Sequence, residues 1–332
     1  MDKYQGLSVC ACHPEKKGDQ DQSKGCGGIH RNDEYEVLAV SAGGKQTQYF
    51  RSHLGARFAV EAASDALRAF ASSVTRDMLF ADERNQSRLL RQLEGSIITA
   101  WKALVRAHLK AYPFQPEEIK AIRNNKYKEN YKKGIDLEYA YRANVTAAIV
   151  AKDYCLMLQN GDGECWIMKN RSRSAKIQKD TIPKNDKCEK EYSTAMCDKT
   201  ALREFRYCCL DTTPAAIFLA AGSRQLYSDK AKEDSVNLDQ IAHELMLKGA
   251  ERNTGLKEKL ESLCRKEKLD YLCMACLWTE DIWSKRLKTQ VRAVWEKYCL
   301  PFKKIAYFVG SAVFLLLIFL IVYMGFTLGS RV

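Results

Sequence analysis

The chain has 332 residues, 13 cysteines and a formal net charge of +12, from 53 Lys and Arg against 41 Asp and Glu. An odd number of cysteines scattered through apolar runs excludes the disulfide framework of a small secreted protein and indicates reduced core residues. The positive charge suits anionic lipid, an acidic partner or nucleic acid. Basic runs such as residues 124–133 lack a nucleic-acid reader motif, so we expect no nucleic-acid partner.

One strand and two long helices are expected in the N-terminal half. The strand covers residues 35–40 and ends in the glycine loop 41–46, the first helix covers 52–70, and the second covers 89–112. Both helices show apolar residues at helical spacing. Pro113 ends the second helix, because proline cannot continue the hydrogen-bond ladder of a helix.

Short strands dominate the C-terminal half. They are expected at residues 145–151, 154–159, 165–168, 215–221 and 271–278, with helices before the last strand. The turn at residues 160–163, with the sequence Asn-Gly-Asp-Gly, is typical of a hairpin between the strands on either side. Helices followed by mostly antiparallel strands favour an α/β (α+β) domain over a doubly wound fold, which would alternate regularly.

Beyond the last strand, one apolar stretch predicts a membrane anchor. Residues 305–328 carry no charged side chain, and at about 1.5 Å per residue a helix of this length crosses a hydrocarbon core of roughly 30 Å. Seven Lys and Arg lie between residues 285 and 304, whereas only Arg331 follows the stretch. By the positive-inside rule we expect a single-pass C-terminal anchor in the membrane, with the N-terminal domain cytoplasmic and membrane lipid as a partner.

The anchor divides the chain into four parts. We expect a large domain over residues 1–280, a basic juxtamembrane helix over 281–304, a transmembrane helix over 305–328 and a short tail over 329–332. No Pro/Gly/Ser-rich linker divides the first part, which is long enough to build a substantial core.

Four segments of the large domain occur in an order known from one enzyme family. They are residues 49–61, 101–114, 158–165 and 214–220. In this order the chain, from about residue 6 to residue 278, resembles the metal-dependent serine/threonine protein phosphatases of the type 2C family, especially the bacterial branch. The resemblance implies two stacked antiparallel β-sheets flanked by helices, with a metal site at one end of the sandwich.

The resemblance also implies a cluster of carboxylates that holds two Mg²⁺ or Mn²⁺ ions around a bridging water. Asp21, Asp162 and Asp270 match acidic positions of the family pattern that contact metal or its water, although Tyr271 follows the last one where Asn or Asp is usual. Lys17 lies near the position where a basic residue of the family would meet phosphate.

Three positions depart from the family pattern. Ala42 stands where an aspartate contacts both metals, Gly44 where a histidine is a candidate general acid, and Gly222 where a later aspartate is expected. Each lost carboxylate removes negative charge that would balance the positive charge of a dication. We therefore expect no catalytic residues and no cofactor, with Mg²⁺ or Mn²⁺ as the ion if a site persists.

These departures predict a membrane-tethered pseudophosphatase, a regulator or scaffold that binds a protein partner or a phosphorylated ligand without turning it over. The rival hypothesis is an active metal-dependent protein serine/threonine phosphatase that uses a reduced site built from Asp21, Asp162 and Asp270. A third hypothesis is a lipid-associated domain in which the basic juxtamembrane helix binds the membrane.

Other site patterns are less specific. Cys273 and Cys276 have the spacing of zinc and redox motifs, but no second such pair accompanies them, and core cysteines are the better interpretation. Cys10, Cys12 and His13 could supply metal ligands, but the sequence names no fourth donor. The loop at residues 41–46 does not fit a phosphate-binding P-loop, because its glycine and serine or threonine positions are not filled.

Overall fold

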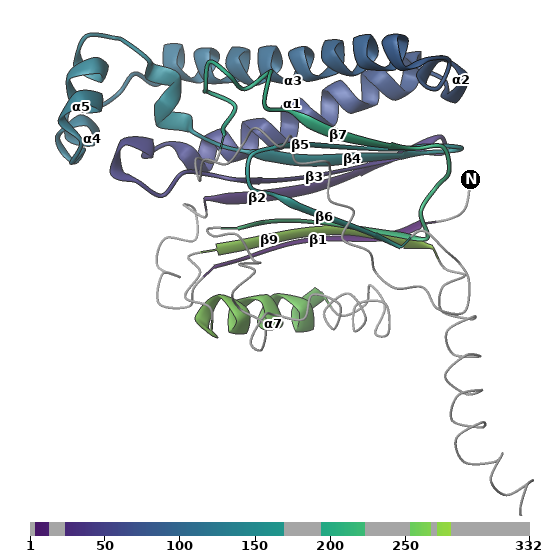
Figure 1. Cartoon of the computed structure of the whole chain (residues 1–332). Coiled ribbons are helices and arrows are strands. Elements are labelled where there is room, and N and C mark those ends of the chain that lie inside the picture. The colour runs from purple at the N-terminus through teal and green to yellow at the C-terminus, as the bar shows by residue number, and fades with distance from the viewer. Residues whose placement is uncertain (1–3, 13–23, 169–193, 223–252, 267–270, 280–332) are drawn as a thin grey trace, which may run out of the picture. The chain divides into compact units, whose positions relative to one another are not determined.

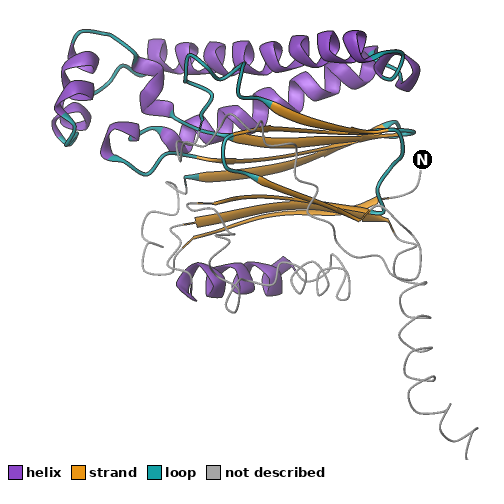
Figure 2. Ribbon diagram, viewed as in Figure 1, coloured by secondary structure: helices purple, strands orange, loops and turns teal. Residues whose placement is uncertain are grey.

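The computed structural model describes residues 4–12, 24–168, 194–222, 253–266 and 271–279. In this part of the chain two antiparallel sheets stack face to face with helices on their outer sides (Figures 1 and 2). The strands are β1 (Tyr4–Cys12), β2 (Gly25–Arg31), β3 (Tyr35–Ala42), β4 (Val145–Ala151), β5 (Cys155–Asn160), β6 (Glu164–Met168), β7 (Arg206–Leu210), β8 (Ala216–Gly222) and β9 (Tyr271–Thr279). One sheet has the order β1-β9-β8-β6 and the other the order β2-β3-β4-β5-β7. This arrangement fits the expected α/β (α+β) sandwich.

Helices cover the outer face of each sheet. They are α1 (Ser52–Ser73), α2 (Arg76–Leu79), α3 (Glu83–Ala111), α4 (Pro116–Lys120), α5 (Asn125–Lys132) and α7 (Asn253–Lys266), with 3-10 turns η2 (Thr47–Tyr49) and η3 (Leu137–Tyr141). In Figure 1, α1 and α3 lie over the five-stranded sheet, and α7 lies on the other side of the sandwich, against β1 and β9. No helix among these described elements is long and apolar enough to cross a bilayer, and the predicted anchor at 305–328 lies outside the described residues.

The central strand β3 joins two hydrophobic cores. Val37 and Ala39 face the helices, whereas Leu38 and Val40 face the second sheet. Successive side chains of a strand point to opposite faces, so a strand buried on both sides is mostly apolar. All eight residues of β3 are buried, and all but Glu36 and Ser41 are apolar.

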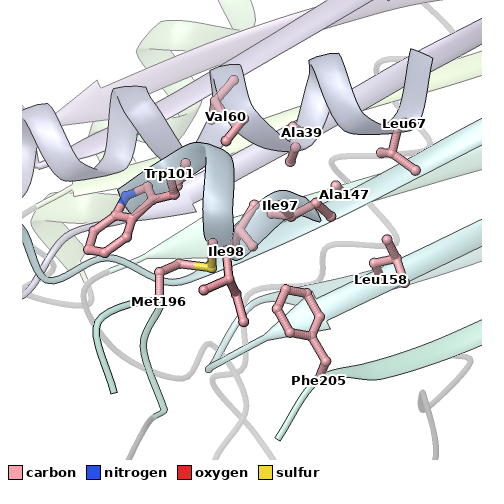
Figure 3. Packing of buried hydrophobic residues seen from close by; sticks show 14 of the residues in the cluster. Ala39, Val60, Leu67, Ile97, Ile98, Trp101, Ala147, Leu158, Met196 and Phe205 are labelled. Atoms are coloured by element: carbon pink, nitrogen blue, oxygen red, sulfur yellow. The ribbon is translucent and has the colours of Figure 1, made fainter. Parts of the chain in front are cut away.

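The core under the helices is organised around Trp101 of α3. Its indole Nε1 donates a hydrogen bond to the carbonyl oxygen of Gly55 in α1, at 2.9 Å. Ile97, on the same helix, packs in the same cluster together with Met196 and Phe205 from the segment before β7 (Figure 3). The two helices expected from apolar spacing are therefore confirmed as the cover of one sheet.

The turn at residues 160–163 does not form the predicted hairpin. β5 pairs with β4 and β7 in the five-stranded sheet, whereas β6 pairs with β8 in the other sheet. The hairpin prediction is wrong because Gly161, at a φ of +93°, turns the chain from one sheet into the other. A local residue pattern does not specify which sheet the next strand enters.

The sequence pattern also gives no signal for β1, β2 and β7. β2 is rich in glycine and lacks the run of β-branched and aromatic residues that is typical of strands. The structure shows why glycine is present, because a Cβ atom added at Gly27 would lie 2.8 Å from the hydroxyl oxygen of Ser8 on β1. A side chain at Gly27 would therefore require Ser8 to move.

Candidate functional site

The expected metal positions lie at strand ends that meet at one end of the sandwich. We call this end of the sandwich the site edge. β3 ends there at Ala42, β8 ends at Gly222, and β9 begins at Tyr271. Gly222 is paired with Leu272, the residue after Tyr271, and the Tyr271 hydroxyl reaches the loop directly after Ala42. Asp162 lies in the turn that leads into β6, the partner of β8.

Ala42 is locked into the site edge by the side chain and backbone of Asn144. Its amide donates to Asn144 Oδ1 at 2.7 Å, and the Asn144 amide donates to the Ala42 carbonyl oxygen at 3.0 Å. Ser41 Oγ adds a hydrogen bond of 2.5 Å to the Asn144 carbonyl oxygen. Ala42 is buried, so its methyl group is held in a fixed place at the site edge.

Donors from the chain itself satisfy the carbonyl oxygens of the loop after Ala42. Tyr271 Oη donates to the Gly43 carbonyl oxygen at 2.6 Å, and Ser52 Oγ donates to that of Gly44 at 2.8 Å. Lys24 Nζ lies 3.1 Å from the Gly44 carbonyl oxygen and 3.3 Å from that of Lys45. The Lys24 ammonium group and the hydroxyl groups of Tyr271 and Ser52 thus bind backbone carbonyl oxygens, which are atoms of the kind that hard dications bind.

Asp162 lies at the same edge, in a turn held by neighbouring polar groups. Gln159 Nε2 donates to the carbonyl oxygens of Gly161, at 2.9 Å, and Gly163. A Cβ atom added at Gly161 would lie 2.5 Å from Asn144 Cβ, so the turn packs directly on the residue that fixes Ala42. Of the expected metal-contacting acids, the structure describes this one.

The remaining predicted site residues lie outside the described residues. They are Lys17, Asp21 and Asp270. β2 begins at Gly25 and β9 at Tyr271, so these three precede described strands that start at the site edge. Within the described ranges, no group of three or more His, Cys, Asp and Glu is arranged to hold a metal ion.

The start of α1, next to the site edge, is electropositive. The pKa of His53 is lowered by burial and then by the charges of Lys24, Arg57, Arg51 and His108. Arg57 is exposed one helical turn after His53. Burial and these positive charges disfavour the protonated imidazole, and the same charges oppose a dication and favour an anion at this edge.

The described donor set does not fit a binuclear Mg²⁺ or Mn²⁺ centre. It offers one predicted carboxylate, from Asp162, beside the Ala42 methyl group and the Lys24 ammonium group, whereas paired dications need several negative oxygens. Sequence reasoning noted Tyr271 but missed the roles of Lys24 and Asn144. Lys24 stands beside a glycine-rich strand with no motif around it, so the sequence offers no signal for its contacts.

The two cysteines that have the spacing of zinc and redox motifs are core residues. Cys273 and Cys276 lie on β9, whose nine residues are all buried. Burial raises the pKa of the Cys276 thiol to about 12, so it stays protonated at neutral pH. Cys10 is paired in register with Cys273 on the neighbouring strand, and both thiols are free. His13, the third ligand considered near the N-terminus, lies outside the described residues.

Comparison with known proteins finds one matching family. The family model described as Protein phosphatase 2C matches residues 15–261. Among solved structures, a variant of a bacterial serine phosphatase is 12% identical, covers 84% of this chain and 99% of its own, and has a TM-score of 0.46. The catalytic domain of the serine/threonine protein phosphatase PstP, solved with two manganese ions, is 11% identical over 82% of this chain and 97% of its own, with a TM-score of 0.45.

A third similar structure is the serine/threonine phosphatase Stp1 from Staphylococcus aureus, which is 13% identical. The match covers 84% of this chain and 96% of that one, with a TM-score of 0.44. No curated protein sequence matches this chain.

Proposed function

Because the chain belongs to the protein phosphatase 2C family, we propose that it is a pseudophosphatase that binds a phosphorylated ligand or protein and does not hydrolyse it. One observation carries this proposal: the Tyr271 hydroxyl binds the Gly43 carbonyl oxygen beside Ala42, where the family has a metal-bridging aspartate. No residue is assigned a catalytic role.

Charge at the site edge supports binding of an anion. A phosphoryl group on a serine or threonine carries about −1.5 to −2 charges at neutral pH and offers three acceptor oxygens. Lys24 and Arg57 bring two cations to the start of α1, and the Ala42 methyl group adds no competing negative charge. This combination favours a phosphate group and disfavours the metal pair that would activate water against it.

A hydrolysis assay tests the proposal. The full chain should show no Mn²⁺-dependent turnover of an aryl phosphate, and Asp162→Asn should leave the background rate unchanged. Turnover that requires Mn²⁺ and disappears in Asp162→Asn would instead support the second candidate, an active protein serine/threonine phosphatase with a reduced site. The observation that favours this candidate is the presence of Asp162 at the same edge as Ala42.

Ligand binding is tested separately with a phosphoserine peptide and its unphosphorylated counterpart. Arg57→Gln should weaken binding of the phosphorylated peptide by about tenfold, because a charge-assisted contact contributes on the order of 1.4 kcal/mol. Arg84→Gln, a change at another exposed helical arginine, should leave it unchanged. Equal binding of both peptides would contradict a phosphate-binding role.

The membrane assignment rests on the sequence and is part of the proposal. The charge-free stretch at 305–328, preceded by basic residues, supports a single-pass anchor with residues 1–280 on the cytoplasmic side. The chain should stay in the membrane after alkaline extraction, and a protease added to the cytoplasmic side should digest the domain. A variant lacking residues 305–332 should become extractable. A lipid-associated role of residues 281–304 is the alternative, and it predicts that this variant stays bound until salt is added.

A further inference from the structure

A basic hairpin formed by α4 and α5, residues 116–135, lies at one end of the helical layer (Figure 1). Its inner side is packed against the domain. The ring of Tyr131 lies 6.1 Å from that of Phe50 and 5.4 Å from that of Phe114, and its hydroxyl donates to the Gln48 carbonyl oxygen at 3.0 Å. These contacts make the hairpin a fixed part of the fold.

An ion pair fixes α4 in the same way. The guanidinium group of the buried Arg51 donates to both carboxylate oxygens of Glu118, at 3.0 and 2.8 Å. Glu118 is therefore turned inward and does not reduce the positive charge on the outer side of the hairpin.

Exposed cations outnumber exposed acids on the hairpin. The exposed cations are Lys120, Arg123, Lys126, Lys132 and Lys133, and the exposed acids are Glu117 and Glu129. Glu129 pairs with Lys132 at 2.8 Å, and the pKa of Glu129 is lowered by that hydrogen bond and by the charges of Lys132, Lys133 and Lys128. Among the described residues, Lys126 and Lys133 have no ion pair. They lie on the face of α5 opposite Tyr127 and Tyr131.

An exposed aliphatic side chain, that of Ile135, follows Lys133 in the chain. The Ile135 amide donates to the Asn130 carbonyl oxygen at 2.8 Å, and the Gly134 amide donates to that of Tyr131 at 3.2 Å. With Gly134 at a φ of +71°, this is the Schellman motif that ends a helix. The motif fixes the backbone of Ile135, whose side chain is left 46% exposed.

We propose that the basic hairpin is a docking surface for a bilayer that contains anionic lipid, with the lysines at the phosphate headgroups and Ile135 in the interfacial region. Each Lys or Arg near an anionic surface strengthens binding by a factor of roughly 5, so this surface alone binds weakly and orients a domain already held at a membrane. Nucleic acid fits less well, because Tyr127 and Tyr131 pack inward and cannot stack on bases.

Lysine footprinting on the full chain tests this proposal. The chain is mixed with vesicles of phosphatidylcholine alone or with about one third phosphatidylserine, and acetylation of each lysine is followed by mass spectrometry. Lys126 and Lys133 should react at least about threefold more slowly on the anionic vesicles, and salt at about 0.5 M should remove the difference. Lys152, in the turn between β4 and β5, is an internal control whose rate should not change.

Two double variants that change the net charge equally distinguish an effect of the hairpin from an effect of the overall charge of the protein. Lys126→Glu with Lys133→Glu should abolish the protection of Lys132, whereas Arg84→Glu with Lys152→Glu, at the start of α3 and beyond β4, should keep it. Ile135→Ser should reduce protection without changing its salt dependence.

Three results would overturn the proposal. The first is equal reactivity of Lys126 and Lys133 on neutral and anionic vesicles. The second is an equal loss of protection in both double variants. The third is protection by an acidic polypeptide such as polyglutamate but not by anionic vesicles, which would assign the surface to a protein partner.

Discussion

Single residues at the site edge occupy backbone carbonyl oxygens of the loop after Ala42. The Tyr271 hydroxyl donates to the Gly43 carbonyl oxygen at 2.6 Å. Lys24 binds the next two carbonyl oxygens of the same loop. Buried carbonyl oxygens need a partner, and in this chain side chains supply it.

This contact predicts a stability effect at Tyr271. Tyr271→Phe removes the donor and leaves the Gly43 carbonyl oxygen without it, so the free energy of unfolding should fall by about 1–2 kcal/mol. Urea denaturation measures the difference. The matched control is Tyr35→Phe, because Tyr35 is also buried and no hydrogen bond of its hydroxyl is found in the described part of the chain. Equal effects of the two changes would contradict the role of the Tyr271 hydroxyl.

From the buried carboxyl group of Glu94 we predict that the stability of the chain depends on pH. Burial raises its pKa to about 7, although Arg91 lies 3.0 Å away and opposes the shift. The folded state therefore holds the proton more tightly than the unfolded state, so ionised Glu94 lowers stability increasingly from about pH 4.5 to pH 7. Glu94→Gln should be more stable than the natural chain by about 2 kcal/mol at pH 8 and nearly equal to it at pH 4. Thermal unfolding at the two pH values checks this, and a difference independent of pH would contradict it.

Among the elements, helices and central strands could be predicted from the sequence, whereas connections between sheets could not. The expected strand at 145–151 has the bounds of β4, because this strand is buried on both faces and reads as an apolar run. β2 escapes notice because it is rich in glycine, and what these glycines pack against, such as Ser8 of β1 at Gly27 and Val60 of α1 at Gly28, is set by the tertiary fold. The turn at Gly161 could lead into a hairpin or into the other sheet, and the local sequence is the same in both cases. Tertiary packing decides between them.

The candidate site was also predictable only in part, because some of its contacts depend on tertiary packing. The strands expected at 35–40 and 215–221 end close to Ala42 and Gly222, and the structure brings the ends of β3 and β8 to one edge. The contacts of Lys24 and Asn144 depend on which side chains meet across that edge. No local pattern contains this information.

Arg51, directly before α1, is paired with Glu118 of α4, and a prediction about stability follows from this contact. Arg51 donates to Glu118 with two nitrogens and to the Tyr141 hydroxyl at 2.9 Å, all with a buried guanidinium group. A lysine cannot make these contacts together, so Arg51→Lys should cost about 2–3 kcal/mol of stability. Arg68→Lys is the matched control, because Arg68 pairs with Asp65 on the exposed side of α1, and it should cost less than about 0.5 kcal/mol. Denaturant titration of both variants decides, and equal losses would contradict the prediction.

At the scale of the whole molecule, the chain belongs to the protein phosphatase 2C family and has two stacked antiparallel sheets flanked by helices. The match over residues 15–261 covers the five-stranded sheet, strands β6 and β8 and helices α1 to α5, whereas β1 and β9 lie outside the matched range. The described residues at the site edge contribute a methyl group, an ammonium group and a tyrosine hydroxyl. A positive edge on a positive protein attracts anions, which agrees with a role in binding phosphorylated partners.

The most direct test of this account is electron paramagnetic resonance of the full chain titrated with Mn²⁺, because two Mn²⁺ ions that share a bridging water give an exchange-coupled signal. We expect no coupled pair at any Mn²⁺ concentration, and the same spectrum for Asp162→Asn as for the natural chain. A coupled signal that is present in the natural chain and lost in Asp162→Asn would contradict the account.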